Sequence, residues 1–152
     1  MAVLLKDIVD ALEMQFDESS YFLDLNTGKV ETVSDDLLRR ADDSIDVEPD
    51  LPAWQGREWE VAKEIVSTGK FRQLPTKFGV HEWAIMRNFS YSVLSDTVRE
   101  DLLNGIHGPG AFRHFKNALR RHRMESVWFT FRAEVLMQIA RSWCEEHHIE
   151  WK

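Results

Sequence analysis

The residues best suited to chemistry lie in one short segment, residues 105–123, which reads GIHGPGAFRHFKNALRRHR. Between Asp101 and Glu125 the chain has no acidic residue, whereas it has five Lys or Arg residues. Guanidinium groups match the geometry of phosphate and carboxylate, and ammonium groups attract these anions as point charges. The segment therefore predicts recognition of an anion.

Helical periodicity places most of these cations on one face. At about 100° per residue, a helix over residues 111–121 separates the cations from the apolar residues. The apolar side, which we expect to pack inward, consists of Phe112, Phe115, Ala118 and Leu119. The tripeptide Gly108-Pro109-Gly110 precedes the helix, so backbone amides at the helix N-terminus could add to an anion site. The predicted anion-binding residues are Gly108, Gly110, Arg113, Lys116, Arg120 and Arg123.

The same segment also fits a purely structural role. Gly-Pro-Gly is typical of an interhelical turn, and cations on the outer face of a helix are ordinary amphipathicity. The known nucleotide motifs do not match it either. Ala111 and Phe112 stand where a P-loop needs Lys and Ser or Thr, and Arg113 replaces the third glycine of a dinucleotide fingerprint. We therefore predict no cofactor.

Metal ligation and catalysis find weaker support. A zinc-protease motif would begin at His81-Glu82, but Ile85 occupies the position of its second histidine. Cys144, His147 and His148 have helical spacing, yet they supply only one thiolate and lack a fourth ligand. We predict no metal site.

No serine lies in a nucleophile-elbow context, so the sequence nominates no catalytic residues. An enzyme, of a hydrolase type, is the third interpretation of the chain. Its only acid or base candidates are His81, Glu82 and His107.

A second kind of partner surface is indicated by tryptophan. Trp54, Trp59 and Trp83, near Pro49 and Pro52, could form an exposed ledge for a protein partner, because tryptophan is enriched at binding hot spots. Core burial of at least two of the three is the alternative, since a domain of this size needs much apolar surface. The residues predicted to bind a protein partner are Trp54 and Trp59.

Charge is distributed unevenly along the chain, whose net charge is −7. Residues 1–61 contain 16 Asp or Glu against 5 Lys or Arg, whereas residues 62–152 contain 10 against 14. The acidic half opposes a long polyanion that lies across the whole surface. An anionic partner is therefore expected to be small or to contact only the C-terminal half.

The elements that must position these residues begin with a helix and a hairpin. Leu5, Ile8, Val9, Leu12 and Phe16 have the spacing of the inner face of an amphipathic helix. Residues 20–25 and 29–33 favour strands, and Asn26-Thr27-Gly28 between them can form a tight turn. An acidic, proline-containing loop is expected at residues 42–54.

The remainder predicts a helical set. A helix is expected over residues 55–68, with Trp59, Ala62, Ile65 and Val66 inward, followed by a candidate third strand at residues 71–74. Four more helices are expected over residues 81–93, 96–104, 111–121 and 126–144. The predicted fold is a helix-rich α+β single domain, in which residues 1–54 hold the helix, hairpin and acidic loop and residues 55–152 the helical part.

The composition predicts a soluble protein of the cytoplasm. The lone cysteine, Cys144, cannot form an intramolecular disulfide, and charged residues interrupt the N-terminal apolar run before a signal-peptide core can form. No apolar run approaches the roughly 20 residues that span a bilayer, so no membrane partner is expected.

Several segments resemble a family of small bacterial cytosolic proteins with no assigned activity. The most recognisable resemblance is to a Gly-Ala-Phe-Arg-x-Phe-Lys motif, matched from Gly110 to Lys116; residues 10–30, 74–89 and the last helix carry the rest. The family has no catalytic residues to carry over, so the resemblance indicates no particular reaction. We therefore expect a non-catalytic binding or regulatory module that presents its basic helix to a nucleic-acid backbone or a phosphorylated ligand. The alternative is an adaptor or inhibitor that contacts a protein partner through exposed Trp and the acidic loop.

Overall fold

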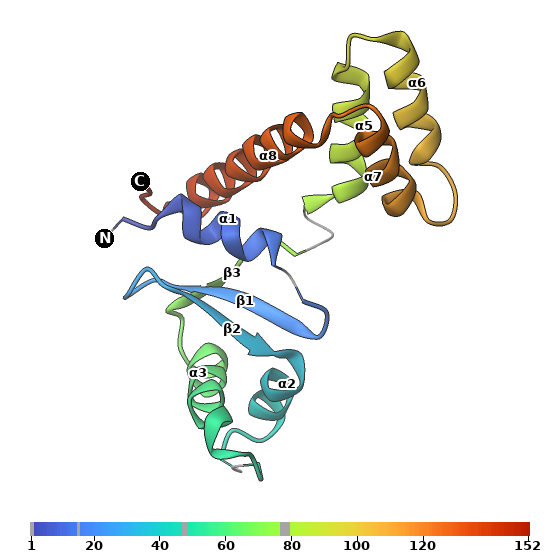
Figure 1. The fold of residues 1–152 in the computed structure, drawn as a ribbon. Helices are drawn as coiled ribbons and strands as arrows, with labels where there is room; N and C mark the ends of the chain where they lie inside the picture. Colours follow the sequence, from blue (N-terminus) through green and yellow to red (C-terminus); the bar gives the residue numbers. More distant parts are fainter. Residues whose placement is uncertain (1, 15, 47–48, 77–79) are drawn as a thin grey trace. The chain divides into compact units, whose positions relative to one another are not determined.

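A computed structural model describes residues 2–14, 16–46, 49–76 and 80–152. Contacts divide the chain into two compact units, one of Met1–Thr76 with Ala140–Lys152 and one of Lys77–Ile139. The described residues form seven α-helices and a three-stranded antiparallel sheet (Figure 1). The predicted helix-rich α+β class is thereby confirmed.

The sheet of the first unit contains the predicted hairpin. Strands β1 (Ser19–Asp24) and β2 (Val30–Ser34) pair antiparallel, and β3 (Phe71–Gln73) pairs antiparallel with the other edge of β1. Gly28 adopts a φ of 74°, as the turn requires, and Asp24 Oδ1 accepts the backbone N–H groups of Asn26 and Thr27. The hairpin and the third strand were both predicted because their turn and strand signals are local.

Helix α1 (Leu5–Glu13) packs through the predicted face, with Leu5, Ile8, Val9 and Leu12 buried. The prediction that Phe16 lies on this buried face is wrong, because the helix ends before it and its side chain is exposed. The chain after the helix is tied to β1 instead: the hydroxyl of Tyr21 donates to the carbonyl of Met14 and accepts the N–H of Phe16.

A helix that the sequence analysis did not assign follows β2. Helix α2 (Asp35–Asp43) begins at Ser34, whose Oγ accepts the N–H of Leu37 as an N-cap. It packs against α3 (Gly56–Ser67) and β2 around a core of Val33, Leu37, Ala41, Trp59 and Ala62. The predicted acidic loop therefore begins later than expected, and a short 3₁₀ helix, η1 (Ala53–Gln55), lies at its end.

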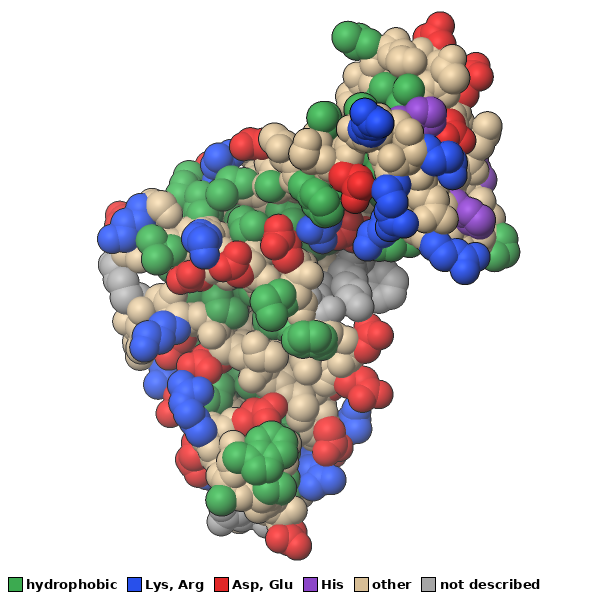
Figure 2. Space-filling view, in the orientation of Figure 1, with side chains coloured by type: hydrophobic (Ala, Val, Ile, Leu, Met, Phe, Trp, Pro, Cys, Tyr) green, Lys and Arg blue, Asp and Glu red, His purple; other side chains and the backbone are tan. Residues whose placement is uncertain are grey.

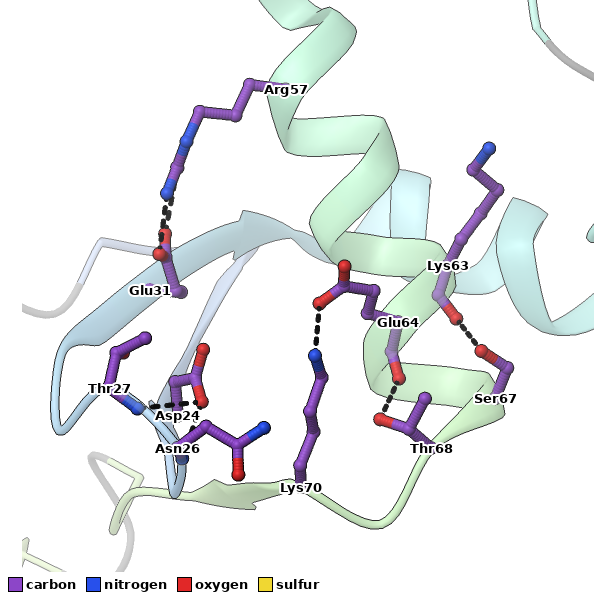
Figure 3. Close-up of polar contacts among 10 residues, drawn as sticks. All are labelled: Asp24, Asn26, Thr27, Glu31, Arg57, Lys63, Glu64, Ser67, Thr68 and Lys70. Atoms are coloured by element: carbon purple, nitrogen blue, oxygen red, sulfur yellow. Dashed lines mark hydrogen bonds and ion pairs between the residues drawn. The ribbon is translucent and has the colours of Figure 1, made fainter.

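Ion pairs and local hydrogen bonds hold the edge of this unit together (Figure 3). Arg57 of α3 points to Glu31 of β2, and its Nη1 and Nη2 donate to the two carboxylate oxygens at 3.0 and 2.8 Å. This contact raises the pKa of Arg57 above its ordinary value through the hydrogen bonds and charge of Glu31. Lys70 Nζ lies 3.1 Å from Glu64 Oε2 beside the end of α3.

The last turns of α8 (Glu125–Glu146) also belong to the first unit, where Ala140, Trp143 and Cys144 are buried. Trp143 Nε1 donates to the carbonyl of Gln73 at 3.1 Å. Burial raises the pKa of the Cys144 thiol, and the neighbouring charge of Glu145 adds to the effect. The two ends of the chain lie side by side (Figure 1), since Val3 pairs with Trp151 as a parallel bridge.

The second unit is helical. It contains α5 (Glu82–Ser92), α6 (Asp96–Gly105), α7 (Ala111–Arg121) and the first part of α8, close to the bounds expected from periodicity. Ser95 is the N-cap residue of α6, and its Oγ accepts the N–H of Val98. Edge-to-face contacts among Phe89, Phe115 and Trp128 join α5, α7 and α8 into one core. Among the described residues, no helix is both long and apolar enough to cross a membrane.

Candidate anion-binding site

Helix α7 carries a hollow that is open to solvent and has a volume of about 600 Å³. We call this cavity the α7 hollow. It is lined by Gly110, Phe112, Arg113, Lys116, Asn117 and Arg120. Three of these side chains carry a positive charge and none carries a negative charge. The structure therefore brings four of the predicted anion-binding residues together, namely Gly110, Arg113, Lys116 and Arg120.

Two glycines set the position of α7. Gly110 is the N-cap residue and has a φ of 74°, a left-handed conformation that glycine adopts without the steric cost of a Cβ atom. Gly105 lets α7 approach α6 closely, since a Cβ there would lie 3.3 Å from the backbone carbon and oxygen of His114. Phe115, Ala118 and Leu119 are buried and fix the inner face, so the cations face solvent.

The cations of the α7 hollow lack a carboxylate partner among the described residues. Within the part of the chain that the structure describes, no carboxylate forms an ion pair with Arg113, Lys116 or Arg120. The first unit differs, because six of its cations each pair with a carboxylate: Lys6, Arg39, Arg40, Arg57, Lys63 and Lys70. An anion that enters the hollow therefore has no such ion pair to displace.

Phe112 corrects the prediction that both phenylalanines of α7 pack inward. Phe115 is 1% exposed, but Phe112 is 48% exposed and lines the hollow. Lys116 Nζ lies 4.6 Å from the centroid of the Phe112 ring, within the range of a cation–π contact. Such a contact at an exposed site stabilises by about 0.5–1 kcal/mol, less than a hydrogen bond between charged groups. The ammonium group of Lys116 can therefore leave the ring for an anion.

Two predicted site residues lie outside the hollow. Gly108 has a φ of 79° in the loop before α7 but does not contribute to the lining. Arg123 lies beyond the end of the helix with a φ of 53°, where the N–H of Met124 bonds to the carbonyl of Leu119 and that of Arg123 to Arg120. This is a Schellman motif, which turns the chain off the helix axis. Arg123 is therefore not the last member of the cationic stripe.

Sequence reasoning missed a polar cluster on the other side of α7. Asp101 of α6 accepts hydrogen bonds from Arg121 Nη2 at 2.9 and 3.1 Å, and its Oδ2 lies 2.6 Å from His122 Nε2. The hydrogen bonds from Arg121 and then His122 hold the pKa of Asp101 below its ordinary value. Asp101 and Arg121 also border a smaller hollow of about 310 Å³, together with His107 and His114. The cluster ties α6 to α7 and orients the helix that carries the α7 hollow.

Asp101→Asn should lower the free energy of unfolding at pH 7 by about 1 kcal/mol or less, as expected for a partly exposed ion pair. Because the pKa of Asp101 is lower in the folded chain, its contribution is present above the unfolded-state value near about pH 4 and is lost as the pH falls through the folded-state value. Urea unfolding of both proteins at pH 7 and at about pH 3 measures this difference. If Asp101→Asn lowers the free energy of unfolding by the same amount at pH 7 and at the acid pH, the lowered pKa of Asp101 does not explain the effect.

The tryptophans predicted to bind a protein partner separate into two environments. Trp59 is 1% exposed and belongs to the core between β2, α2 and α3, so it cannot contact a partner, which corrects its assignment. Trp54 on η1 is 78% exposed and stays accessible. Trp83 is about half buried, and its Nε1 donates to the carbonyl of Ile106 in the loop before α7. Only one of the three is buried in the core.

Of the three acid and base candidates, Glu82 and His107 have structural partners, whereas His81 is the N-cap residue of α5 and its side chain caps no N–H group. Glu82 accepts hydrogen bonds from Arg132, which links α5 to α8. The ring of His107 packs edge-on against Trp83, and His107 lines the smaller hollow. Over the described residues, no group of three or more His, Cys, Asp or Glu could hold a metal ion. Cys144 is buried, and His147 Nδ1 lies 2.8 Å from the carbonyl oxygen of Trp143.

The two compact units also differ in the sign of their net charge. Residues 77–139 contain nine Lys or Arg against six Asp or Glu, whereas the first unit contains ten against twenty. In Figure 2, Lys and Arg side chains stand close together on the part that contains α5–α7, and Asp and Glu side chains are frequent around α2 and α3. The α7 hollow therefore lies in the positively charged unit.

No family model matches the chain, and neither the curated proteins nor the solved structures contain a significant match to it. Interpretation of the α7 hollow therefore depends on its own geometry and charge.

Proposed function

We propose that this chain is a cytoplasmic, non-catalytic binding or regulatory module whose α7 hollow binds the phosphate groups of a nucleic-acid backbone. The observation that carries the proposal is a set of three solvent-facing cations, Arg113, Lys116 and Arg120, to which no described carboxylate is ion-paired. Guanidinium and ammonium groups form strong, charge-assisted hydrogen bonds with phosphate oxygens. Membership of the family of small bacterial cytosolic proteins that the motif resembles is part of the proposal.

The geometry favours a backbone over a small phosphorylated ligand. Arg113 and Arg120 are seven residues apart on one helix, which corresponds to about 10.5 Å along its axis. Cations spaced along a line suit successive phosphates, whereas a single phosphate group needs cations that converge. The hollow is also open, but pockets for small ligands usually enclose about 70–90% of the ligand surface.

Charge limits the length of nucleic acid that can bind. The first unit has twice as many acidic as basic residues, so it repels a polyanion. Three cations also define a small footprint. We therefore propose a short contact, made by α7 alone, to a strand end, a loop or a short single strand.

A second candidate is a protein-partner adaptor or inhibitor that uses Trp54 and the acidic loop. The accessibility of Trp54 supports it, because large exposed aromatic side chains are typical anchors at protein interfaces. With Trp59 buried, this candidate depends on one aromatic residue, and we rank it second.

Reversal of the three charges tests the first candidate. The triple variant Arg113→Glu, Lys116→Glu and Arg120→Glu should bind a labelled oligonucleotide of about 12 nucleotides roughly a hundredfold more weakly, at about 1 kcal/mol for each lost contact. Fluorescence anisotropy over a salt series measures both affinity and slope. For the unchanged protein, the logarithm of the binding constant should fall against that of the salt concentration with a slope of about −2, the value for three phosphates of a single strand.

The matched control changes the net charge equally but outside the hollow. Lys6→Glu, Lys29→Glu and Lys152→Glu replace three exposed cations of the first unit. This control should bind within about twofold of the unchanged protein at moderate salt, because screening limits interactions beyond about 8 Å. Equal losses in both triple variants, or no salt-sensitive binding by the unchanged protein, would rule out the α7 hollow as a phosphate site.

A further inference from the structure

Phe112 is an aromatic side chain in a place that packing does not explain. It lies in the first turn of α7, is about half exposed and lines the hollow beside Lys116. The core contact of α7 is made three residues later by Phe115, which packs against Phe89 and Trp128. The protein therefore presents a flat apolar ring among cations, at the edge of the helix face that contacts solvent.

This combination matches the chemistry of unpaired nucleobases. Proteins that bind single strands combine cations along the backbone with aromatic rings on which bases stack. In a duplex, the faces of the bases are covered by neighbouring base pairs, so a protein ring has nothing to stack on unless the duplex is opened. A ring that stands beside unpaired cations therefore discriminates between the two forms of nucleic acid.

We propose that the α7 hollow binds single-stranded nucleic acid, with one base stacked on Phe112 and the adjoining phosphates held by Arg113, Lys116 and Arg120. This inference rests on the proposed function, since it requires that the cations bind a phosphate backbone. Lys116 has two roles in it: its ammonium group covers the ring in the unliganded chain, 4.6 Å from the centroid, and moves to a phosphate when a base arrives. Stacking on an aromatic ring tolerates any base, so sequence preference should be weak.

The experiment distinguishes the contribution of the base to binding from that of the phosphates. Three probes of about 12 nucleotides are compared by fluorescence anisotropy: a single strand, a duplex of the same sequence, and an abasic strand that keeps every phosphate. The unchanged protein should bind the single strand roughly tenfold more tightly than the abasic strand or the duplex, the effect of one stacked base.

Variants at Phe112 then locate the stacking surface. Phe112→Leu keeps an apolar side chain but removes the ring, and it should bind the single strand and the abasic strand equally. Phe112→Trp keeps a ring and should retain the preference. Both variants should keep the salt slope of the unchanged protein and change its Tm little, since the side chain of Phe112 is about half exposed.

Equal binding of single and abasic strands by the unchanged protein overturns the stacking inference and leaves phosphate binding intact. A preference that survives in Phe112→Leu overturns the assignment to this ring. Tighter binding of the duplex than of the single strand also overturns the inference. Binding of none of the probes overturns the proposed function itself.

Discussion

Replacement of Phe115 by alanine is expected to lower the free energy of unfolding by about 3–5 kcal/mol, the range for removal of a buried aromatic ring. Phe115 is 1% exposed, and its ring centroid lies 4.9 Å from that of Trp128 and 6.3 Å from that of Phe89. The substitution removes edge-to-face contacts that add to the burial of the ring, and it leaves a cavity between α5, α7 and α8. Urea unfolding followed by circular dichroism measures the loss.

Phe112 of the same helix supplies the matched control. The same change in side chain, Phe112→Ala, should lower the free energy of unfolding by about 1 kcal/mol or less, because it removes a half-exposed ring and its contact with Lys116. Two phenylalanines separated by less than one helical turn would then differ about threefold or more in their effect on stability. Similar losses in both variants would contradict the assignment of Phe112 to the surface.

Trp59→Ala is expected to have an effect of similar size in the first unit, about 3–5 kcal/mol. The indole ring is 1% exposed and fills the space between β2, α2 and α3, where Val33, Leu37 and Ala62 pack around it. Since small domains are stable by about 5–15 kcal/mol in total, this variant should lie close to the unfolding threshold at physiological temperature. Thermal unfolding gives its Tm, and urea unfolding gives the free energy.

Trp54→Ala is the control for Trp59→Ala, because the side chain of Trp54 is exposed and its removal should leave stability nearly unchanged.

The two core variants, Phe115→Ala and Trp59→Ala, also test the predicted single domain. Trp59 lies in the first compact unit and Phe115 in the second. In a single cooperative domain, both substitutions lower the midpoint of one shared transition. Two transitions, each lowered by one of the substitutions, would contradict the prediction of one domain.

The elements that the sequence predicted well are those whose signals are local. The hairpin follows from the turn at Gly28, and helix α7 follows from a glycine start and the apolar spacing of Phe115, Ala118 and Leu119. Helix α2 was not recognised, although Ser34 followed by Asp35 and Asp36 is a typical helix start. Its strongly charged composition leaves only Leu37 and Ala41 to be buried, so the apolar pattern that would identify it is sparse.

The candidate site was predicted only in part, because helical spacing alone decides which residues share a face and not which of them are buried. Helical spacing placed Arg113, Lys116 and Arg120 on one face, but it also placed Phe112 among the inward residues. At about 100° per residue, Phe112 lies only about 40° from Lys116, at the border between the two faces. Burial at such a border depends on whether a neighbouring helix extends over it, which no pattern within α7 encodes.

Tertiary geometry explains the remaining differences. Asp101 and His122 are separated by 21 residues, and their contact depends on the close approach of α6 and α7 at Gly105. Arg123 leaves the helix face because α7 ends in a Schellman motif without the usual glycine. Neither feature has a signature within a single helical pattern.

The buried thiol near the end of α8 has a practical consequence. Cys144 is the only sulfhydryl group in the chain, it is fully covered, and its raised pKa keeps the reactive thiolate scarce. An alkylating reagent therefore reaches it only during moments when the last turns of the helix open. The rate at which Cys144 is alkylated in the native chain therefore measures how often the end of α8 opens. The measurement needs no substitution, because the cysteine is already present.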